Sequence, residues 1–455
     1  MSNRSFVRAA MALALTIAAD AHAASDADLA EIREQIRQLK SSYEARINAL
    51  EEKLNEAEAA KKATPAAAMP AAPAAKAASG SNTFNPAVSV VLQGVYANLK
   101  QDPGNYRLSG FPLGDDVEAP RRGFSLAESE ITLSANVDDK FTGSLTLALT
   151  PENTVSVEEA YAVATAVPYG IVPKFGRFFS GIGYLNEQHQ HNWDFYDAPL
   201  VYQAYLGGQY TNDGLQVKWG APTDLFLEFG AEVGSGEGFP GTGRNKNGIG
   251  NGTAYVHAGG DVGTSNSWRA GLSYLQTSAD NREYNQADLA GNDALLGFSG
   301  RSKLAIADFV WKWAPSGNAR EQNFKLQGEY FWRREKGDLT YDTDGMLGLT
   351  QSGDYTSNQR GYYVQGIYQF LSSWRIGLRY DQLRPGDTNF GVNAAFLQDE
   401  GFNPSRGTVM VDWTPSEFSR FRVQYARALL VPGVTDNQLF VQYILTLGAH
   451  GAHRY

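Results

Sequence analysis

Apolar and polar residues alternate one by one over much of the chain after residue 84. In one clear stretch, the apolar Trp374, Ile376 and Leu378 alternate with Arg375 and Arg379. The same period of two recurs at 142–149, 420–425 and 441–447. Successive side chains of a strand point to opposite faces, so this pattern predicts strands with one apolar and one polar face. A soluble β-sandwich can show the same alternation, but it seldom ends so many strands in Trp or Tyr.

The connections between these segments alternate in length. Short, turn-like connections are expected at 222–224, 263–266, 315–321, 371–373 and 415–419. Long connections are expected at 234–252, 278–300, 334–358 and 384–405. Bacterial outer-membrane barrels pair short periplasmic turns with long outer loops. Continued to a first strand near 87–98, the alternation predicts an all-β, 16-stranded antiparallel transmembrane β-barrel with both chain ends in the periplasm.

The first 83 residues predict three further segments. Residues 1–23 predict a signal peptide, because a basic start, a short apolar core and a small-x-small cleavage pattern follow in order. Residues 26–60 carry apolar residues every seven positions, which predicts a periplasmic coiled coil, dimeric or trimeric, with a single amphipathic helix as the alternative. The Ala/Pro-rich residues 61–83 predict a linker. The barrel then occupies 84–455.

Composition and charge narrow the class of protein. The chain has no cysteine, which excludes thiol chemistry and disulfides. Beyond the signal peptide there is no run of 18 apolar residues, so no transmembrane helix is predicted. Residues 1–83 are neutral, and the net charge of −10 therefore falls on the barrel region. Such an acidic balance argues against nucleic acid as a partner and weakens a simple case for anion preference.

One outer connection is a candidate pore constriction. About 34 residues separate the strands near 171–179 and 214–220, and they form the third outer loop, at about 180–213. We expect this loop to fold into the barrel and narrow it. Candidate pore residues are the loop acid and the arginines on inward-facing positions: Arg177, Glu187, Arg375, Arg379, Arg420 and Arg422. These arginines either line an anion path or form salt bridges with acidic loop residues.

The same loop contains a possible metal motif, H-x-H-x-x-D-x-x-D. Its potential ligands are His189, His191, Asp194 and Asp197. Imidazole and carboxylate groups at this density suit a divalent transition metal such as zinc. The alternative is that these side chains hydrogen-bond the folded loop to the barrel wall. No other feature of the chain predicts a cofactor.

Taken with the coiled coil, linker and barrel, three short motifs resemble the phosphate-selective porin O and P family. They are E-S-E-I-T-L-S-A-N-V-D at 128–138, K-F-G-R-F at 174–178 and W-D-F at 193–195. The resemblance spans nearly the whole mature chain and implies a trimeric channel for small anions or other polar solutes.

The histidine-rich loop and the ending G-A-H-G-A-H are also similar to a porin-sized group labelled zinc-regulated TonB-dependent receptors. Such receptors need a globular plug and a barrel of about 22 strands. Residues 24–83 leave no room for a plug.

The sequence therefore predicts an outer-membrane porin of a Gram-negative bacterium, through which small polar or charged solutes diffuse passively. We expect a homotrimer embedded in outer-membrane lipid. No hydrolase, metalloprotease or phosphate-loop motif is present, so an enzyme is not predicted. Two alternatives of other classes remain: a metal-binding or zinc-uptake protein, and a structural barrel that serves as an anchor for the coiled coil.

Overall fold

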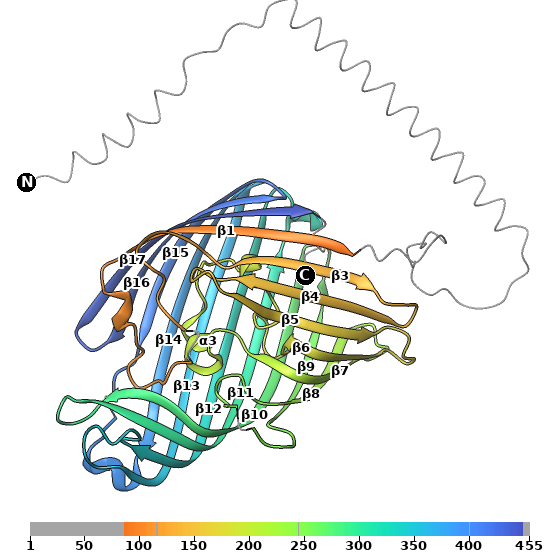
Figure 1. Cartoon of the computed structure of the whole chain (residues 1–455). Helices are drawn as coiled ribbons and strands as arrows, with labels where there is room; N and C mark the ends of the chain where they lie inside the picture. Colours follow the sequence, from red (N-terminus) through yellow and green to blue (C-terminus); the bar gives the residue numbers. More distant parts are fainter. Residues whose placement is uncertain (1–85, 115–116, 244, 400, 449–455) are drawn as a thin grey trace, which may run out of the picture. The chain divides into compact units, whose positions relative to one another are not determined.

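In the computed structural model, which describes residues 86–114, 117–243, 245–399 and 401–448, the strands form one antiparallel sheet (Figure 1). The strands are β1 (Ala87–Leu99), β2 (Gly123–Leu126), β3 (Ser129–Asn136), β4 (Phe141–Leu149), β5 (Val155–Ala164), β6 (Ile171–Phe179), β7 (Thr211–Gly220), β8 (Phe226–Gly234), β9 (Asn251–Val262), β10 (Asn266–Ala287), β11 (Asp293–Trp313), β12 (Asn323–Tyr341), β13 (Gln351–Leu371), β14 (Trp374–Asn389), β15 (Ser405–Ser416), β16 (Ser419–Val431) and β17 (Val434–Gly448). The helical turns are η1 (Pro103–Asn105), η2 (Gln190–Asn192), α3 (Leu200–Leu206), η3 (Pro315–Gly317) and η4 (Gly391–Ala395).

The sheet closes on itself. β1 pairs with β17 over a continuous register from Ser89↔Gly448 to Leu99↔Gln438. On its other edge β1 pairs with both β2 and β3, which together make one interrupted strand of the barrel. The 17 strands therefore occupy 16 positions, and the predicted 16-stranded antiparallel barrel is confirmed.

The barrel exposes apolar side chains on its outer face and buries polar side chains on its inner face, the reverse of a soluble protein. Leu378 is 62% exposed on the outer face, whereas Asp381 and Gln424 are fully buried on the inner face. Near the tight turns, the outward rings of Trp374, Trp413 and Phe421 stack with centroids 6.0 and 5.7 Å apart. An apolar outer band, an aromatic border and a polar interior are the features of a barrel that contacts lipid.

The turns lie where the sequence places them, but three outer loops are shorter than predicted. Strands β10 to β14 continue into the expected loops at 278–300, 334–358 and 384–405, and the connections shrink to 288–292, 342–350 and 390–404. In Figure 1 these strands are the long arrows whose ends extend beyond their neighbours. The extensions contain many polar residues, so their composition resembles that of a loop. The hydrogen-bonded ladder nevertheless continues, and inward apolar side chains, among them Leu296, Phe298 and Leu339, form a buried cluster there.

The signal peptide, the coiled coil and the linker predicted for residues 1–83 lie outside the described residues. Among the described residues, no helix has the length and hydrophobicity needed to span a membrane.

Candidate functional site

The segment between β6 and β7, residues 180–210, leaves the wall and runs through the barrel interior; we call it the inserted loop. All seven residues of α3 are buried, and the helix packs against β13 and β14. Its first N–H groups are free of helical partners, and that of Leu200 donates to Asp381 on β14 at 2.9 Å. Arg333 on β12 donates to the carbonyl of Ala204 at 3.0 Å. The loop is thus held by side chains that point inward from the wall.

A tight turn starts the path of the loop across the interior. Gly183 has φ +65°, and a Cβ there would lie 2.3 Å from the carboxylate of Glu329. That carboxylate accepts the backbone N–H groups of Tyr184 and Leu185, both at 3.2 Å, and the hydroxyl of Tyr202 at 2.9 Å. Glycine is required because any side chain would displace the acceptor that fixes the turn.

Residues 194–197 of the loop are fixed by cations of the wall; we call Asp194 and Asp197 with Lys325, Arg375, Arg379 and Arg406 the arginine-side anchor. Asp194 pairs with Lys325 and, at 3.1 Å, with Arg375. Asp197 pairs with Arg406 and, at 2.8 Å, with Arg379. Burial alone would raise the pKa of Asp197, but Arg406 and Arg379 lower it to about 2. The pKa of Asp194 is also lowered, against burial, by Lys325 and Arg375.

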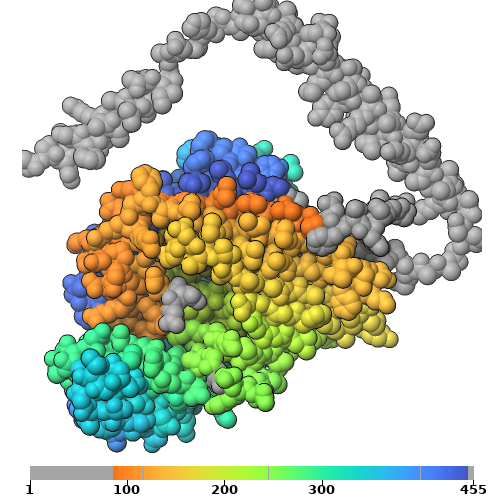
Figure 2. All heavy atoms as spheres, in the orientation of Figure 1, coloured from red at the N-terminus to blue at the C-terminus, as the bar shows by residue number. Residues whose placement is uncertain are grey.

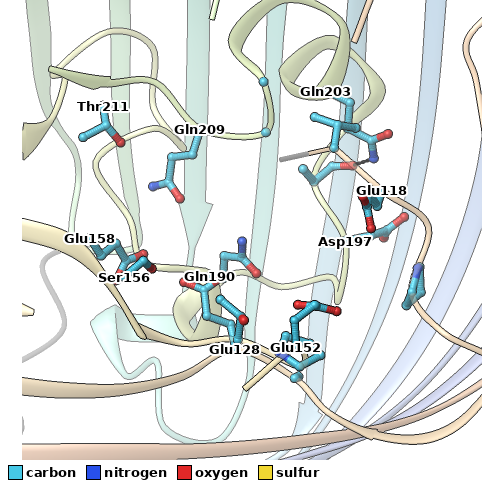
Figure 3. A pocket seen from close by; sticks show the side chains of 18 of the residues that line it. Glu118, Glu128, Glu152, Ser156, Glu158, Gln190, Asp197, Gln203, Gln209 and Thr211 are labelled. Atoms are coloured by element: carbon cyan, nitrogen blue, oxygen red, sulfur yellow. Dashed lines mark hydrogen bonds between the residues drawn. The ribbon is translucent and has the colours of Figure 1, made fainter. Parts of the chain in front are cut away.

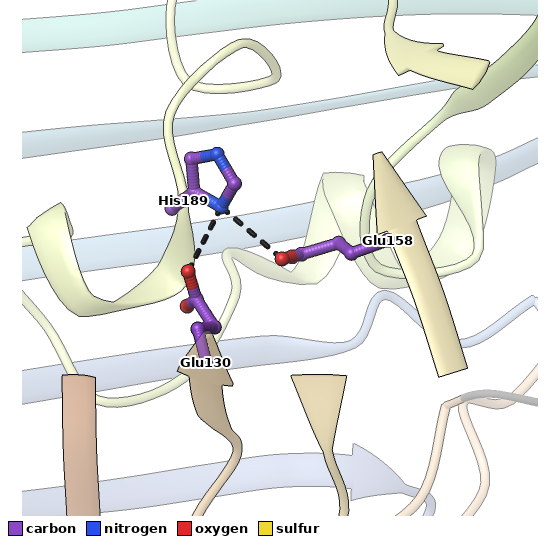
Figure 4. A group of neighbouring side chains, drawn as sticks. All are labelled: Glu130, Glu158 and His189. Carbon is purple, nitrogen blue, oxygen red and sulfur yellow. Dashed lines mark hydrogen bonds and ion pairs between the residues drawn. The ribbon is translucent and has the colours of Figure 1, made fainter. Parts of the chain in front are cut away.

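The neighbouring residues 189–191 of the loop meet acids; we call His189 and His191 with Glu130, Glu158 and Glu159 the histidine-side anchor. His189 Nδ1 lies 3.1 Å from Glu130 and 3.2 Å from Glu158, as Figure 4 shows. Its Nε2 lies 3.1 Å from Glu159. His191 Nδ1 lies 2.9 Å from the second oxygen of Glu130. Burial lowers the pKa of His189, but the hydrogen bonds to the three carboxylates raise it well above its usual value.

A β-bulge in β5 explains how two neighbouring acids reach the same imidazole. Thr146 on β4 pairs with Glu159, and the next residue, Leu147, pairs with Val157, so Glu158 is an extra residue. Adjacent side chains of a regular strand point to opposite faces, but a bulge places two residues opposite one and re-aims a side chain. Glu158 and Glu159 therefore both face the interior.

The break between β2 and β3 likewise turns another acid, Glu130, toward the barrel interior. Leu126 pairs with Gly94 and Glu130 pairs with Val91, which leaves three residues on one strand opposite two on β1. Leu126 is 46% exposed on the outer face, while Glu130, four residues later, is buried on the inner face. Glu128 lies beside Glu158, with which its carboxyl group shares a hydrogen bond. Four carboxylates therefore gather where the inserted loop presents its histidines.

Between the inserted loop and the wall formed by β1 to β8 lies a cavity of about 1100 Å³. In the space-filling view, the surface is hollowed between the orange part of the chain and the yellow-green part (Figure 2). Figure 3 shows Glu128, Glu158 and Gln190 gathered on one side of this cavity and Asp197 on another. The acidic residues that line it are Glu118, Glu128, Glu152, Glu158, Asp197, Asp213 and Glu237. Its basic lining residues are Arg121 and Arg177.

The six predicted pore residues make different contacts in the structure. Arg177 lines the cavity and pairs with Asp213 at 2.7 Å. Glu187 pairs with Lys218, which, with Lys174, lowers its pKa to about 2 although burial raises it. Arg375 and Arg379 belong to the arginine-side anchor. The last two donate to loop carbonyls: Arg420 to His191 at 3.3 Å and Arg422 to Trp193 at 2.7 Å.

The structure also separates the four predicted metal ligands. His189 and His191 face glutamates, whereas Asp194 and Asp197 are held by lysine and arginine. Among the residues that the structure describes, one set of three groups could hold a metal ion: Glu130, Glu158 and His189, whose ligand atoms lie within 4.8 Å of one another. Sequence reasoning missed the glutamates. The adjacent acids Glu158 and Glu159 carried a usable signal, because they break the alternation of a lipid-facing strand.

Comparisons with known proteins give structural likeness and one sequence relative. No family profile matches the chain. OmpT, an outer membrane protein of Vibrio cholerae, has a TM-score of 0.48 at 11% identity, covering 80% of this chain and 97% of that one. The outer membrane channel DcaP of Acinetobacter baumannii has a TM-score of 0.47 at 12% identity, with the same coverage. An anion-selective porin from Comamonas acidovorans has a TM-score of 0.47 at 10% identity, covering 80% and 99%. Likeness at this level carries no inference about function.

The sequence relative is an uncharacterized protein from Aquifex aeolicus (strain VF5). It is 31% identical over 363 residues, which cover 74% of this chain and 71% of that protein. The chain belongs to the same family as this Aquifex aeolicus protein.

Proposed function

We propose that the chain is an outer-membrane porin, a passive channel for small polar or charged solutes that is narrowed by the inserted loop. The observation that carries the proposal is the polar cavity of about 1100 Å³ between that loop and the wall. A barrel used only as an anchor can fill its interior with side chains and needs no such space. The apolar outer face supports the location, because it suits contact with lipid.

The lining of the cavity supports a preference for cations. Seven acidic side chains line it against two arginines. Asp197 is already paired with Arg379 and Arg406 of the wall, and Glu128 and Glu158 share a hydrogen bond, so these three carry less negative charge than the count suggests. Both arginines have an acidic partner: Arg177 pairs with Asp213 at 2.7 Å, and Arg121 lies 3.6 Å from Glu152. Rings of carboxylates favour cations in water-filled pores. The arginines that an anion path would need are engaged with the inserted loop instead.

Single-channel recording in a planar bilayer tests this proposal. We expect stepwise conductance from the purified full chain, and a reversal potential of the sign for cation preference under a KCl gradient. Replacing two lining acids, Glu118→Gln with Glu237→Gln, should move the reversal potential toward zero. Glu417→Gln, in the turn between β15 and β16 and away from the cavity, is the matched control and should leave it unchanged.

Either of two results would contradict the proposal. Silence from correctly folded protein would exclude a channel and leave the anchor function. A reversal potential of the opposite sign would keep the channel but reject the cation preference.

We further propose that the porin acts as a homotrimer. The support is the heptad pattern predicted at 26–60, which suits association of copies through a coiled coil. Native mass spectrometry of the detergent-solubilised chain should give the mass of three copies. Ile36→Asp with Leu50→Asp should reduce that mass to one copy if the heptads hold the trimer together. A trimer that persists in this variant would place the contacts in the barrel.

A further inference from the structure

We propose that Glu130, Glu158 and His189 form a binding site for a divalent transition metal of the zinc type, oriented by Glu159. The site joins the inserted loop to strands β3 and β5 (Figure 4). It differs from the ligand set that the loop sequence suggested, since both aspartates of that set are occupied by cations of the wall.

The distances suit a tetrahedral zinc ion. His189 Nδ1 lies 3.1 Å from Oε2 of Glu130 and 3.2 Å from Oε2 of Glu158. Zinc binds nitrogen and carboxylate oxygen at about 2.0–2.2 Å, so two ligand atoms on one tetrahedral ion are about 3.3–3.6 Å apart. The ligand atoms of all three groups lie within 4.8 Å of one another, so the groups can reach one ion once the glutamate side chains adjust. A fourth position is left for water.

The second ring nitrogen of His189 faces a carboxylate, as it does in many zinc sites. A histidine that binds zinc through one nitrogen usually donates its other N–H to a carboxylate, which fixes the tautomer and the ring orientation. Here Nε2 lies 3.1 Å from Glu159, while Nδ1 faces the two ligand carboxylates. Glu159 is itself held by the backbone N–H of Phe179 at 3.1 Å. The ring is further packed edge-on against Phe179 at 5.3 Å.

The negative charge of the glutamate cluster is only partly balanced by the two histidines. In the parts of the chain that the structure describes, no ion pair joins Glu128, Glu130, Glu158 or Glu159 to a lysine or arginine. The ion-pair partners of Glu130, Glu158 and Glu159 are histidines. Buried carboxylates without a positive partner are costly. A divalent ion would balance two of them. It replaces the proton on Nδ1 of His189, which is released to solvent, while the proton shared by Glu128 and Glu158 stays on Glu128, so that Glu158 binds as a carboxylate.

An ion can reach the site from the cavity. Glu158 and Glu128 both line the cavity, and Gln190, next to His189, does so too.

The mixed nitrogen and oxygen ligands favour zinc-type ions over magnesium or calcium, which prefer all-oxygen sites.

Isothermal titration with ZnCl₂ tests the site on the full chain, purified in detergent and stripped with a chelator. All proteins carry His450→Gln and His453→Gln, so that these two histidines do not compete for zinc. We expect one Zn²⁺ per chain. Glu158→Gln keeps a hydrogen-bond acceptor for His189 but removes a ligand charge, and His189→Gln removes the nitrogen ligand. Each should weaken binding by more than about 100-fold, and Glu159→Gln, which alters only the orienting group, by about 10–100-fold.

The matched control is His257→Gln. His257 is a buried histidine of the barrel wall that faces one carboxylate, Glu228, at 3.2 Å. This variant should bind zinc as the parent does. Co²⁺ as a second probe should give the visible absorption of a nitrogen- and oxygen-ligated ion in the parent and lose it in His189→Gln.

Three outcomes would overturn the proposal. They are no zinc bound by the parent, unchanged affinity in both Glu158→Gln and His189→Gln, and equal loss in the His257→Gln control. Retention of the parent's heat-modifiable migration on gels shows that each variant has folded. Because titration in detergent needs no ion flow, its result is independent of the channel proposal.

Discussion

The inserted loop is attached at two places that use opposite chemistry. At the arginine-side anchor, buried aspartates of the loop meet lysine and arginine of β12, β14 and β15, and every acid has a permanent cation beside it. At the histidine-side anchor, loop histidines meet glutamates of β3 and β5. The positive charge there depends on a bound proton or metal ion. The first anchor is therefore fixed over the ordinary pH range, and the second changes with conditions.

The largest effect is expected from breaking the arginine-side anchor. Asp197→Asn leaves Arg379 and Arg406 buried without their loop partner. Removing one member of a buried ion pair costs about 3–5 kcal/mol, because a desolvated charge remains. We expect a loss of about 3 kcal/mol in the free energy of unfolding, measured by tryptophan fluorescence in denaturant, and a noisier, larger conductance. Unchanged stability would show that this anchor does not hold the loop.

Zinc should strengthen the histidine-side anchor alone. If the proposed site exists, free Zn²⁺ at 100 times its dissociation constant adds about 2.7 kcal/mol to the free energy of unfolding. Thermal unfolding with and without zinc measures this. Asp197→Asn should gain as much as the wild type, whereas Glu158→Gln, with its affinity more than about 100-fold weaker, should gain less than about 0.4 kcal/mol. An equal gain in both variants would place the zinc elsewhere.

The two anchors should respond to pH in opposite directions. The pKa of His189 is raised on folding, so its contribution to stability is complete below about pH 6.5 and is lost as the pH rises through the raised value. The pKa of Asp197 is lowered to about 2, so its contribution is complete above its usual 3.8 and is lost as the pH falls through about 2. The other titratable groups that face His189 are Glu128, Glu130, Glu158, Glu159 and His191.

Unfolding measured from pH 6 to pH 10 separates the two contributions. The wild type should lose stability relative to His189→Gln, at no more than about 1.4 kcal/mol per pH unit for one proton. Asp197→Asn should follow the wild-type slope, since its histidine-side anchor is intact. Parallel curves for the wild type and His189→Gln would contradict the raised pKa.

The smallest effect is expected at a salt bridge outside both anchors. Arg177 and Asp213 are 40% and 39% exposed, and exposed pairs contribute about 0–1 kcal/mol. Arg177→Gln should therefore leave stability nearly unchanged, by denaturant unfolding, while raising the cation preference in bilayer recordings. A large loss of stability would mean that the lining pairs, and not only the anchors, hold the loop.

The barrel could be predicted from the sequence because a lipid-facing strand has a strict rule. Val423, 50% exposed on the outer face, and the next residue, Gln424, buried on the inner face, show the alternation from which the strands were predicted. The rule weakens in the extensions of β10 to β14, where polar residues are frequent and the apolar inner face is a short cluster that includes Leu296 and Leu339. For this reason the ends of β10 to β14 were predicted as loops.

The site was harder to predict, because its parts are joined only by folding. The loop sequence offered histidines and aspartates at ligand spacing, but nothing in that spacing reveals that Lys325 and Arg375, more than 100 residues away, take Asp194. Nor does it reveal that Glu130 and Glu158 meet at His189. Residue type predicted the chemistry, and strand register decided the partners.

The single extra residue in β5 has a consequence for recognising this site in other chains. Without Glu158 the strand would pair regularly and keep a single inward acid, Glu159. Two consecutive acids in a regular strand would place one of them toward lipid, where a charge is costly. A chain one residue shorter here can keep every strand and its overall composition and still lack the cluster. The length of this strand between its two turns, more than its content of acids, is therefore the feature by which a sequence comparison can tell which members of the family share the site.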